Sequence, residues 1–253
     1  MKKIAVILLI LTLTLAMAAC GGEEPKTALA YDIYSQATEA MSNIESLAAN
    51  TSATIFMLVE DDDVEMVMSG LIKVVCISET EVEMQMDMST KVIGETMDFS
   101  SFYKGGIYYV EMSGQKLAME LPLDQIQEQA TTEALSFPDT AIKNQQATAK
   151  DGGHELTFLL DGSALTDSAI AQLGSLSEML AGQPEITVGD IEYVVFIDGQ
   201  GNLKTTLMSF SMELSVRGET VPMNAEISLE YVQFNDVSID FPDDLDSYQL
   251  FSL

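Results

Sequence analysis

Long stretches of this chain alternate strictly between apolar and polar residues. The clearest runs are residues 82–88, 208–217 and 225–231, in which every second residue is apolar. Successive side chains of a β-strand point to opposite faces, so such runs predict strands with one face in a core and one in water. This pattern favours an antiparallel sheet over a parallel α/β sheet, whose strands are apolar on both faces.

Turn signals separate the alternating runs. Glycine-containing turns are expected at residues 104–106, 113–115, 151–153 and 198–202, and an acidic turn at residues 60–63. Each of these segments lies between two apolar stretches, which is typical of β-hairpins. We therefore expect about ten or eleven strands.

Three segments have helical rather than strand periodicity. Residues 27–47 place Ala30, Tyr34, Ala37, Met41 and Ile44 on one apolar stripe. Residues 123–135 follow a proline, and residues 165–180 precede a glycine, which are common helix boundaries. The expected fold class is α+β, with two to three helices and an antiparallel sheet, in a single domain over residues 27–250.

The first twenty residues have the composition of a secretory signal. Lys2 and Lys3 precede an apolar run over residues 4–15, and small residues lead to Cys20. This end resembles the lipobox of bacterial lipoproteins, with Met17 where that motif usually has leucine. The resemblance implies a signal peptide over residues 1–19, a lipidated Cys20, and a tether over residues 20–26. The alternative is an ordinary secretory signal cut nearby, which would leave Cys20 as a free thiol.

The net charge excludes two kinds of partner. The chain has 11 Lys and Arg against 40 Asp and Glu, a formal charge of −29. Phosphate contacts to nucleic acid need clustered basic residues, and so does electrostatic binding to an anionic membrane. We therefore expect no nucleic-acid partner. The lipobox resemblance implies membrane attachment through a lipidated Cys20 at the extracytoplasmic face of the cell membrane, and we expect a monomeric protein.

The remainder of the chain resembles lipoproteins of Gram-positive bacteria with a LolA-like or LppX-like half-barrel. The resemblance rests on an amphipathic helix over residues 31–41, a strand–turn–strand over 102–109, and the segments 193–198 and 234–242. It implies a curved antiparallel sheet, a half-barrel, that wraps helices on its concave side. It also implies an apolar, lipid-like ligand in the concavity, although no ligand-contacting residue transfers individually.

Methionine is unusually frequent, at 16 residues. Thioethers are soft ligands, so the Met66/Met68 and Met84/Met86/Met88 spacings could suggest copper(I). The same spacing places every sulfur on the apolar face of a strand, and packing is the better interpretation. Flexible methionines can also adapt to varied apolar partners. The candidate ligand-binding residues on the concave face are Met66, Met68, Met84, Met86, Met88, Met208, Phe210 and Met212.

No residue pattern indicates catalysis or a cofactor. His154 is the single histidine and follows a turn, so it supplies neither a triad nor a zinc site. Cys76 lies in an apolar run and is interpreted as a small buried hydrophobe rather than a reactive thiol. The acidic clusters at residues 60–63 and 240–246 could bind calcium but lack EF-hand spacing, so solvated turns are expected.

Two functions remain open. The favoured one is a non-enzymatic, membrane-anchored lipoprotein that binds an apolar ligand or an envelope component in its concavity. The alternative is a structural or protein-interaction module whose helices fill the concavity and leave no ligand cavity. An open volume between the sheet and the helices would favour the ligand binder, and a filled one would favour the interaction module.

Overall fold

The computed structural model describes residues 30–41, 43–59, 62–78, 81–123, 139–163, 185–216 and 219–251. One helix lies wholly within these residues, α1 (Ala30–Met41), together with a single sheet. Two 3-10 turns, Asp139–Ala141 and Leu245–Ser247, complete the regular structure. The strands are β1 (Ser46–Val59), β2 (Asp62–Cys76), β3 (Val82–Val92), β4 (Glu95–Lys104), β5 (Ile107–Met112), β6 (Gln115–Glu120), β7 (Ile142–Lys150), β8 (Gly153–Leu160), β9 (Glu185–Ile197), β10 (Leu203–Val216), β11 (Glu219–Phe234) and β12 (Gln249–Leu250).

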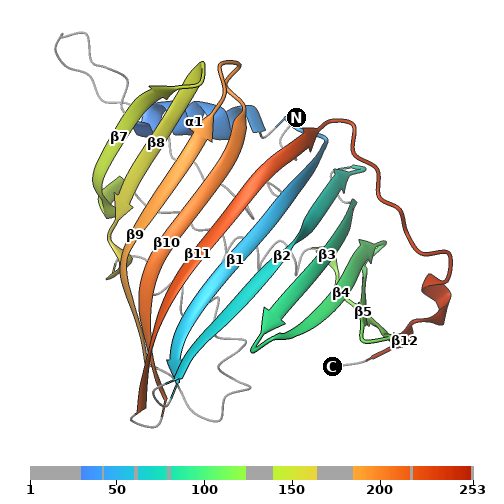
Figure 1. Ribbon diagram of the computed structural model, residues 1–253. Coiled ribbons are helices and arrows are strands. Elements are labelled where there is room, and N and C mark those ends of the chain that lie inside the picture. The colour runs from blue at the N-terminus through green and yellow to red at the C-terminus, as the bar shows by residue number, and fades with distance from the viewer. Residues whose placement is uncertain are drawn as a thin grey trace.

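The sheet has 12 strands in the order β12-β6-β5-β4-β3-β2-β1-β11-β10-β9-β8-β7. It is curved and twisted, and the two chain-distant strands β1 and β11 lie side by side at its centre (Figure 1). Hairpins generate every neighbouring pair except β1–β11, β8–β9 and β6–β12. The β1–β11 pairing brings the beginning of the chain against its end, so the register there decides which residues share a face.

Helix α1 lies across one face of the sheet, against β7, β8, β9 and β10 (Figure 1). We call this the inner face. The buried side of α1 consists of Ala30, Tyr34, Ala37, Thr38 and Met41, so the predicted apolar stripe is confirmed as far as Met41. Phe158, Leu156 and Val195 pack beneath it and are fully buried. Burial of such side chains contributes about 1.5–3 kcal/mol each, which makes this contact the centre of the core.

The helix ends earlier than its periodicity predicts. The backbone N–H groups of Asn43 and Ile44 donate to the carbonyls of Ala40 and Met41, a tighter spacing than in an α-helix. β1 then starts at Ser46, within the predicted helical range. Ile44 continues the stripe and packs against the core, although it lies beyond the helix.

A C-terminal segment crosses the opposite, outer face of the sheet, from the end of β11 to the edge strand β6 (Figure 1). The Phe241 ring packs on Phe102 with 6.1 Å between centroids, and Tyr248 meets Tyr109 at 5.4 Å. The segment ends in β12, which pairs with β6 in parallel. Short pairing of this kind covers an edge that would otherwise offer free backbone groups.

The predicted fold class is wrong in three respects, although the curved sheet agrees. The sheet is mixed rather than wholly antiparallel, because the C-terminal segment returns across the outer face and brings β12 alongside β6 in the same direction. It has 12 strands rather than ten or eleven. The sheet does not wrap two to three helices: one α-helix lies wholly within the described residues, and it covers only the β7–β10 end. The helices predicted over residues 123–135 and 165–180 lie outside the described residues, apart from residue 123 itself.

Candidate functional site

The inner face of the sheet carries mostly apolar side chains. Met84 pairs with Val74, and Met86 pairs with Ile72, between β2 and β3. The residues that pair with these in β1, and their partners in β11, lie on the same face. The physical cause is the strict alternation of these strands, which sends every second side chain to this face. At the β7–β10 end α1 covers the face, so the part beyond α1 is where a ligand could lie.

A groove with a volume of about 230 Å³ lies on this part of the inner face. Strands β1 to β5 and β11 form it, so residues distant in the chain meet there. The lining residues are almost all apolar or aromatic: Leu47, Ala49, Ile72, Val74, Met84, Met86, Ser101, Phe102, Tyr103, Tyr108 and Leu229. Known ligand pockets share this composition, with a few polar groups among many apolar ones.

The polar side chains among these lining residues are Ser101, Tyr103 and Tyr108. Ser101 and Tyr103 are each 2% exposed, so they belong to the wall rather than to its rim. None of the described residues that line the groove carries a formal charge. An acyl chain would lose little hydration of polar groups on entering such a groove, whereas a charged group would lose much more.

Gly70 makes room for one of the inner-face methionines. It pairs with Met88 across β2 and β3, and a Cβ atom at Gly70 would collide with the Met88 sulfur and the Asp87 carbonyl oxygen. The missing side chain interrupts the apolar series of β2 between Met68 and Ile72. The Met88 side chain therefore occupies the space that a larger residue would otherwise take.

The predicted ligand-binding residues all fall on the inner face, but only two line the groove. Met84 and Met86 contribute to its wall. Met208 and Phe210 instead pack against the core. The remaining four are half-buried on the same face, outside the groove lining: Met66, Met68, Met88 and Met212. Ligand contact by any of the eight stays a prediction.

Sequence reasoning missed the groove residues outside the methionine runs. Leu47 and Ala49 come from β1, and Leu229 from β11. Leu229 lies in a recognised alternating run, so its face could be predicted but its neighbours could not. Tyr103 and Tyr108 lie on either side of the Gly105-Gly106 turn and pair directly with each other. The turn predicted at residues 104–106 would have allowed this pairing to be inferred from the sequence.

Tyrosines form the polar part of the core between α1 and the sheet. The hydroxyl groups of Tyr34 and Tyr193 are 3.4 Å apart, and both rings pack edgewise or tilted around Phe158. Burial raises the pKa of Tyr34 and of Tyr231 well above the usual tyrosine value. Burial likewise raises the pKa of Tyr193. These groups stay neutral at physiological pH, and the contact between Tyr34 and Tyr193 links α1 to β9.

The other residues considered for chemistry lie apart from the groove. Cys76 is half-buried at the end of β2, and burial together with Glu45 raises the pKa of its thiol, which makes it a poorer nucleophile. His154 is exposed in β8. The described residues contain no group of three or more His, Cys, Asp or Glu side chains placed to hold a metal ion.

The predicted acidic clusters are partly described. In the cluster at 240–246, Asp240 lies 3.9 Å from Lys73 and Asp244 lies 2.6 Å from Lys116. These carboxylates take part in pairs with lysines of the outer face, which weakens the calcium interpretation. In the cluster at 60–63, residues 60 and 61 lie outside the described residues.

The signal peptide, Cys20 and the tether also lie outside the described residues, so their assignment stays a prediction. Among the residues that the structure describes, no helix is long and apolar enough to span a membrane.

Comparisons with solved structures give low sequence identity and low structural similarity. LprF from Mycobacterium bovis is 12% identical, with 85% of this chain and 96% of that chain covered and a TM-score of 0.45. A DUF1329 family protein from Desulfovibrio piger is 10% identical, with 85% and 96% covered and a TM-score of 0.28. A structure titled for lipid–protein interactions in lipovitellin is 8% identical, with 78% and 26% covered and a TM-score of 0.36. This chain thus spans about a quarter of the lipovitellin chain.

No curated protein matches the sequence. The sequence model of DUF6612, a family of unknown function, matches residues 29–247. That range runs from just before α1 to the 3-10 turn that precedes β12, and so includes the groove and most of the outer-face segment. The chain therefore belongs to the DUF6612 family.

Proposed function

We propose that this protein is a non-enzymatic binder of an apolar, lipid-like ligand, held at the extracytoplasmic face of the cell membrane by a lipidated Cys20. The observation that carries the proposal is the groove on the inner face, with a volume of about 230 Å³ and an almost wholly apolar lining. The anchor comes from the sequence pattern around Cys20, and the ligand class from the chemistry of the groove.

The groove favours an acyl chain over a polar small molecule. Each methylene that leaves water contributes about 0.8 kcal/mol, so even a chain segment of about six methylenes gains roughly 5 kcal/mol. A sugar or nucleotide would need several hydrogen-bonding partners, and the lining offers only Ser101 and two tyrosines. Met84 and Met86 can change rotamer at low cost, which suits a flexible chain of variable length.

The same lining supports a role without catalysis. General acid–base catalysis mostly uses His, Asp, Glu, Lys, Tyr or Cys side chains, and nucleophilic catalysis needs an activated group beside a base. Among the described lining residues, Ser101, Tyr103 and Tyr108 are the candidates for such roles, and no His, Asp, Glu, Lys or Cys side chain lines the groove with them. A ligand in this place would be held rather than converted.

The experiment compares two lysine substitutions on the same strand. Met86→Lys puts a charge into the groove, whereas Ser89→Lys puts it on the outer face of β3. Binding of the neutral fluorescent probe N-phenyl-1-naphthylamine to the purified chain is measured by titration. We expect saturable binding to the unsubstituted chain and to Ser89→Lys, and at least about tenfold weaker binding to Met86→Lys.

A second variant separates loss of the site from loss of the fold. Ile72→Phe fills the groove with an apolar side chain, so it should also weaken probe binding while circular dichroism shows retained strands. Native mass spectrometry of the purified chain tests for a co-purifying lipid. Unchanged binding in both groove variants, or no saturable binding and no lipid, would reject the proposal and favour a protein-interaction module with a filled core.

A further inference from the structure

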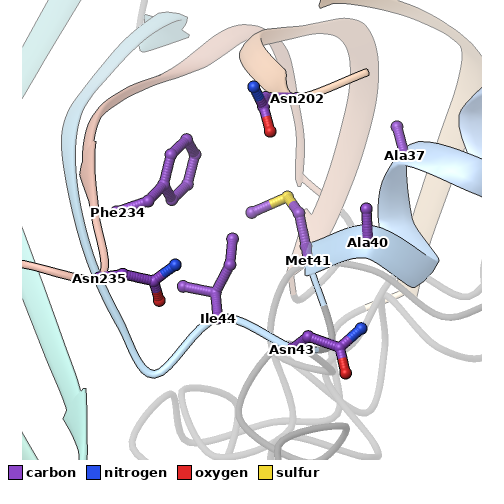
Figure 2. A pocket seen from close by; sticks show the side chains of 8 residues that line it. All are labelled: Ala37, Ala40, Met41, Asn43, Ile44, Asn202, Phe234 and Asn235. Atoms are coloured by element: carbon purple, nitrogen blue, oxygen red, sulfur yellow. The ribbon is translucent and has the colours of Figure 1, made fainter. Parts of the chain in front are cut away.

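A second pocket lies at the C-terminal end of α1 (Figure 2). Its volume is about 190 Å³, and it shares no lining residue with the groove. Three parts of the chain meet there: the α1–β1 connection, the turn between β9 and β10, and the end of β11. The lining residues are Ala37, Ala40, Met41, Asn43, Ile44, Asn202, Phe234 and Asn235.

The carboxamide of Asn202 is held in one orientation. Its Nδ2 donates to both carboxylate oxygens of Asp198, at 3.3 and 3.2 Å, and its backbone N–H donates to Asp198 Oδ1 at 2.9 Å. A carboxylate can only accept hydrogen bonds, so the nitrogen end must face Asp198. The oxygen end therefore lies toward the middle of the pocket (Figure 2). It offers an acceptor there.

The carboxamide of Asn235 has the opposite orientation. Its Oδ1 accepts a hydrogen bond from the backbone N–H of Glu45 at 2.7 Å. The backbone of Asn235 has a φ of 59°, a left-handed conformation that asparagine adopts more readily than most residues. With the oxygen end fixed on Glu45, just before β1, the nitrogen end is directed toward Met41 and Ile44 (Figure 2). It offers a donor to the pocket.

An apolar surface lies between the two carboxamides. Met41 is 1% exposed, and the side chains of Ile44 and Phe234 converge with it on the same space (Figure 2). The Phe234 ring stacks on Tyr231 with 5.9 Å between centroids, which holds the ring in place. None of the lining residues is charged, and the nearby Lys204 and Asp198 lie 3.6 Å apart as an ion pair.

We propose that this pocket binds a neutral peptide unit that carries one apolar side chain. The peptide N–H donates to Asn202 Oδ1, the peptide carbonyl accepts from Asn235 Nδ2, and the side chain packs on Met41, Ile44 and Phe234. A neutral amide presents both a donor and an acceptor, which complement the carboxamides of Asn202 and Asn235. An anion supplies no donor for Asn202, and an ammonium group supplies no acceptor for Asn235. Each would also lose more hydration than a neutral amide on entering an uncharged pocket.

The test uses saturation-transfer NMR on the purified full-length chain, with N-acetyl-L-leucinamide as the probe. Free L-leucine, which is charged at both ends, tests whether the pocket prefers a peptide unit or a free amino acid. We expect saturable transfer to the blocked leucine and at least about fivefold weaker binding of free leucine, because its two charged ends lose more hydration on entering the pocket than neutral amides do. Equal binding of the two compounds would overturn the proposal.

Variants then locate the binding site. Asn235→Asp keeps an acceptor for the Glu45 N–H but loses the donor, so binding should weaken about fivefold. Asn224→Asp is the matched control, because this residue lies exposed on the outer face of β11. Ala40→Leu fills the pocket from an exposed helical position, where folding should be retained, and should abolish binding.

The outcomes separate this pocket from the groove. Met86→Lys should leave binding of N-acetyl-L-leucinamide unchanged, since the two sites share no residue. If Asn235→Asp fails to fold, Ala40→Leu decides alone. Unchanged binding in folded Ala40→Leu would overturn the assignment, and so would loss of binding in Met86→Lys.

Discussion

Buried tyrosine hydroxyl groups in the core differ in whether they have a partner. Tyr193 accepts or donates a hydrogen bond with Tyr34 at 3.4 Å and also bonds the side chain of Thr206. Tyr231 is 3% exposed, and its hydroxyl has no hydrogen-bond partner among the described residues. A buried polar group without a partner lowers stability, whereas a paired one contributes a small net gain.

This difference predicts opposite effects for the same substitution. Tyr231→Phe removes an unpaired hydroxyl and should raise the free energy of unfolding by about 1 kcal/mol. Tyr193→Phe leaves Tyr34 and Thr206 without that partner and should lower it by about 1 kcal/mol. Urea unfolding of both variants checks the pair, and Tyr193→Phe serves as the control for loss of one oxygen. A loss of stability in Tyr231→Phe would show that its hydroxyl is bonded.

Residue-scale chemistry also explains one turn that the sequence did not reveal. β3 and β4 are joined at Ile93 and Gly94, which have φ values of 50° and 81°. Asparagine or aspartate usually occupies the first of these positions, so a β-branched isoleucine gives no turn signal. Ile93 is 81% exposed and has no packing that would compensate for this backbone conformation.

At the scale of elements, alternation predicted the strands well and the helix boundaries less well. The runs at 82–88, 208–216 and 225–231 lie within β3, β10 and β11, and the glycine turns at 105–106 and 113–114 join β4, β5 and β6. β12 has two residues, too few to show any period. Pairing between distant strands is not encoded locally, so Leu47 and Leu229 could not be placed in one groove from the sequence.

The C-terminal segment acts as a clamp on the outer face. Tyr248 is 7% exposed, its hydroxyl lies 3.3 Å from Glu111 Oε2, and Lys116 lies 5.3 Å from its ring. Lys116, which lies in β6, also donates a hydrogen bond to Asp244, so this lysine contacts the segment at both Asp244 and Tyr248. An exposed lysine pair of this kind contributes little alone, so the aromatic contacts should carry most of the stability.

Removing the Tyr248 ring should therefore loosen this segment. Tyr248→Ala should lower the free energy of unfolding by about 3 kcal/mol, as for other buried aromatic truncations. Size-exclusion chromatography should also show association, because the edge of β6 loses its cover. Leu250→Ala is the control in the same segment, since this side chain is 57% exposed and should change stability by less than about 0.5 kcal/mol. Equal stability of the two variants would mean that Tyr248 does not hold the segment.

At the scale of the whole molecule, two pockets lie next to each other on one face, since Leu47 of the groove pairs with Phe234 of the second pocket. α1 covers the β7–β10 end of that face, the groove lies over β1–β5 and β11, and the amphipathic pocket lies at the C-terminal end of the helix. The groove is built from side chains of one sheet face, whereas the second pocket depends on carboxamides fixed in connecting turns. Loops on a rigid scaffold are the usual place for polar recognition, and the sheet supplies apolar area.

Net charge sets the response of the whole molecule to salt. With 11 basic and 40 acidic residues, repulsion among carboxylates outweighs the described lysine pairs, such as Lys143 with Asp190 and Lys104 with Glu83. Salt screens both kinds of interaction: the Debye length falls from about 30 Å at 0.01 M to about 8 Å at 0.15 M. The larger, repulsive sum loses more, so folding should become more favourable. We expect the Tm to rise by about 3 °C over this range, equivalent to about 1 kcal/mol.

Differential scanning calorimetry in NaCl measures the shift, and CaCl₂ at equal ionic strength is the control for cation binding by the acidic clusters. A fall in Tm would mean that the ion pairs outweigh the repulsion, and a much larger rise in calcium would mean that the clusters at 60–63 or 240–246 bind the ion.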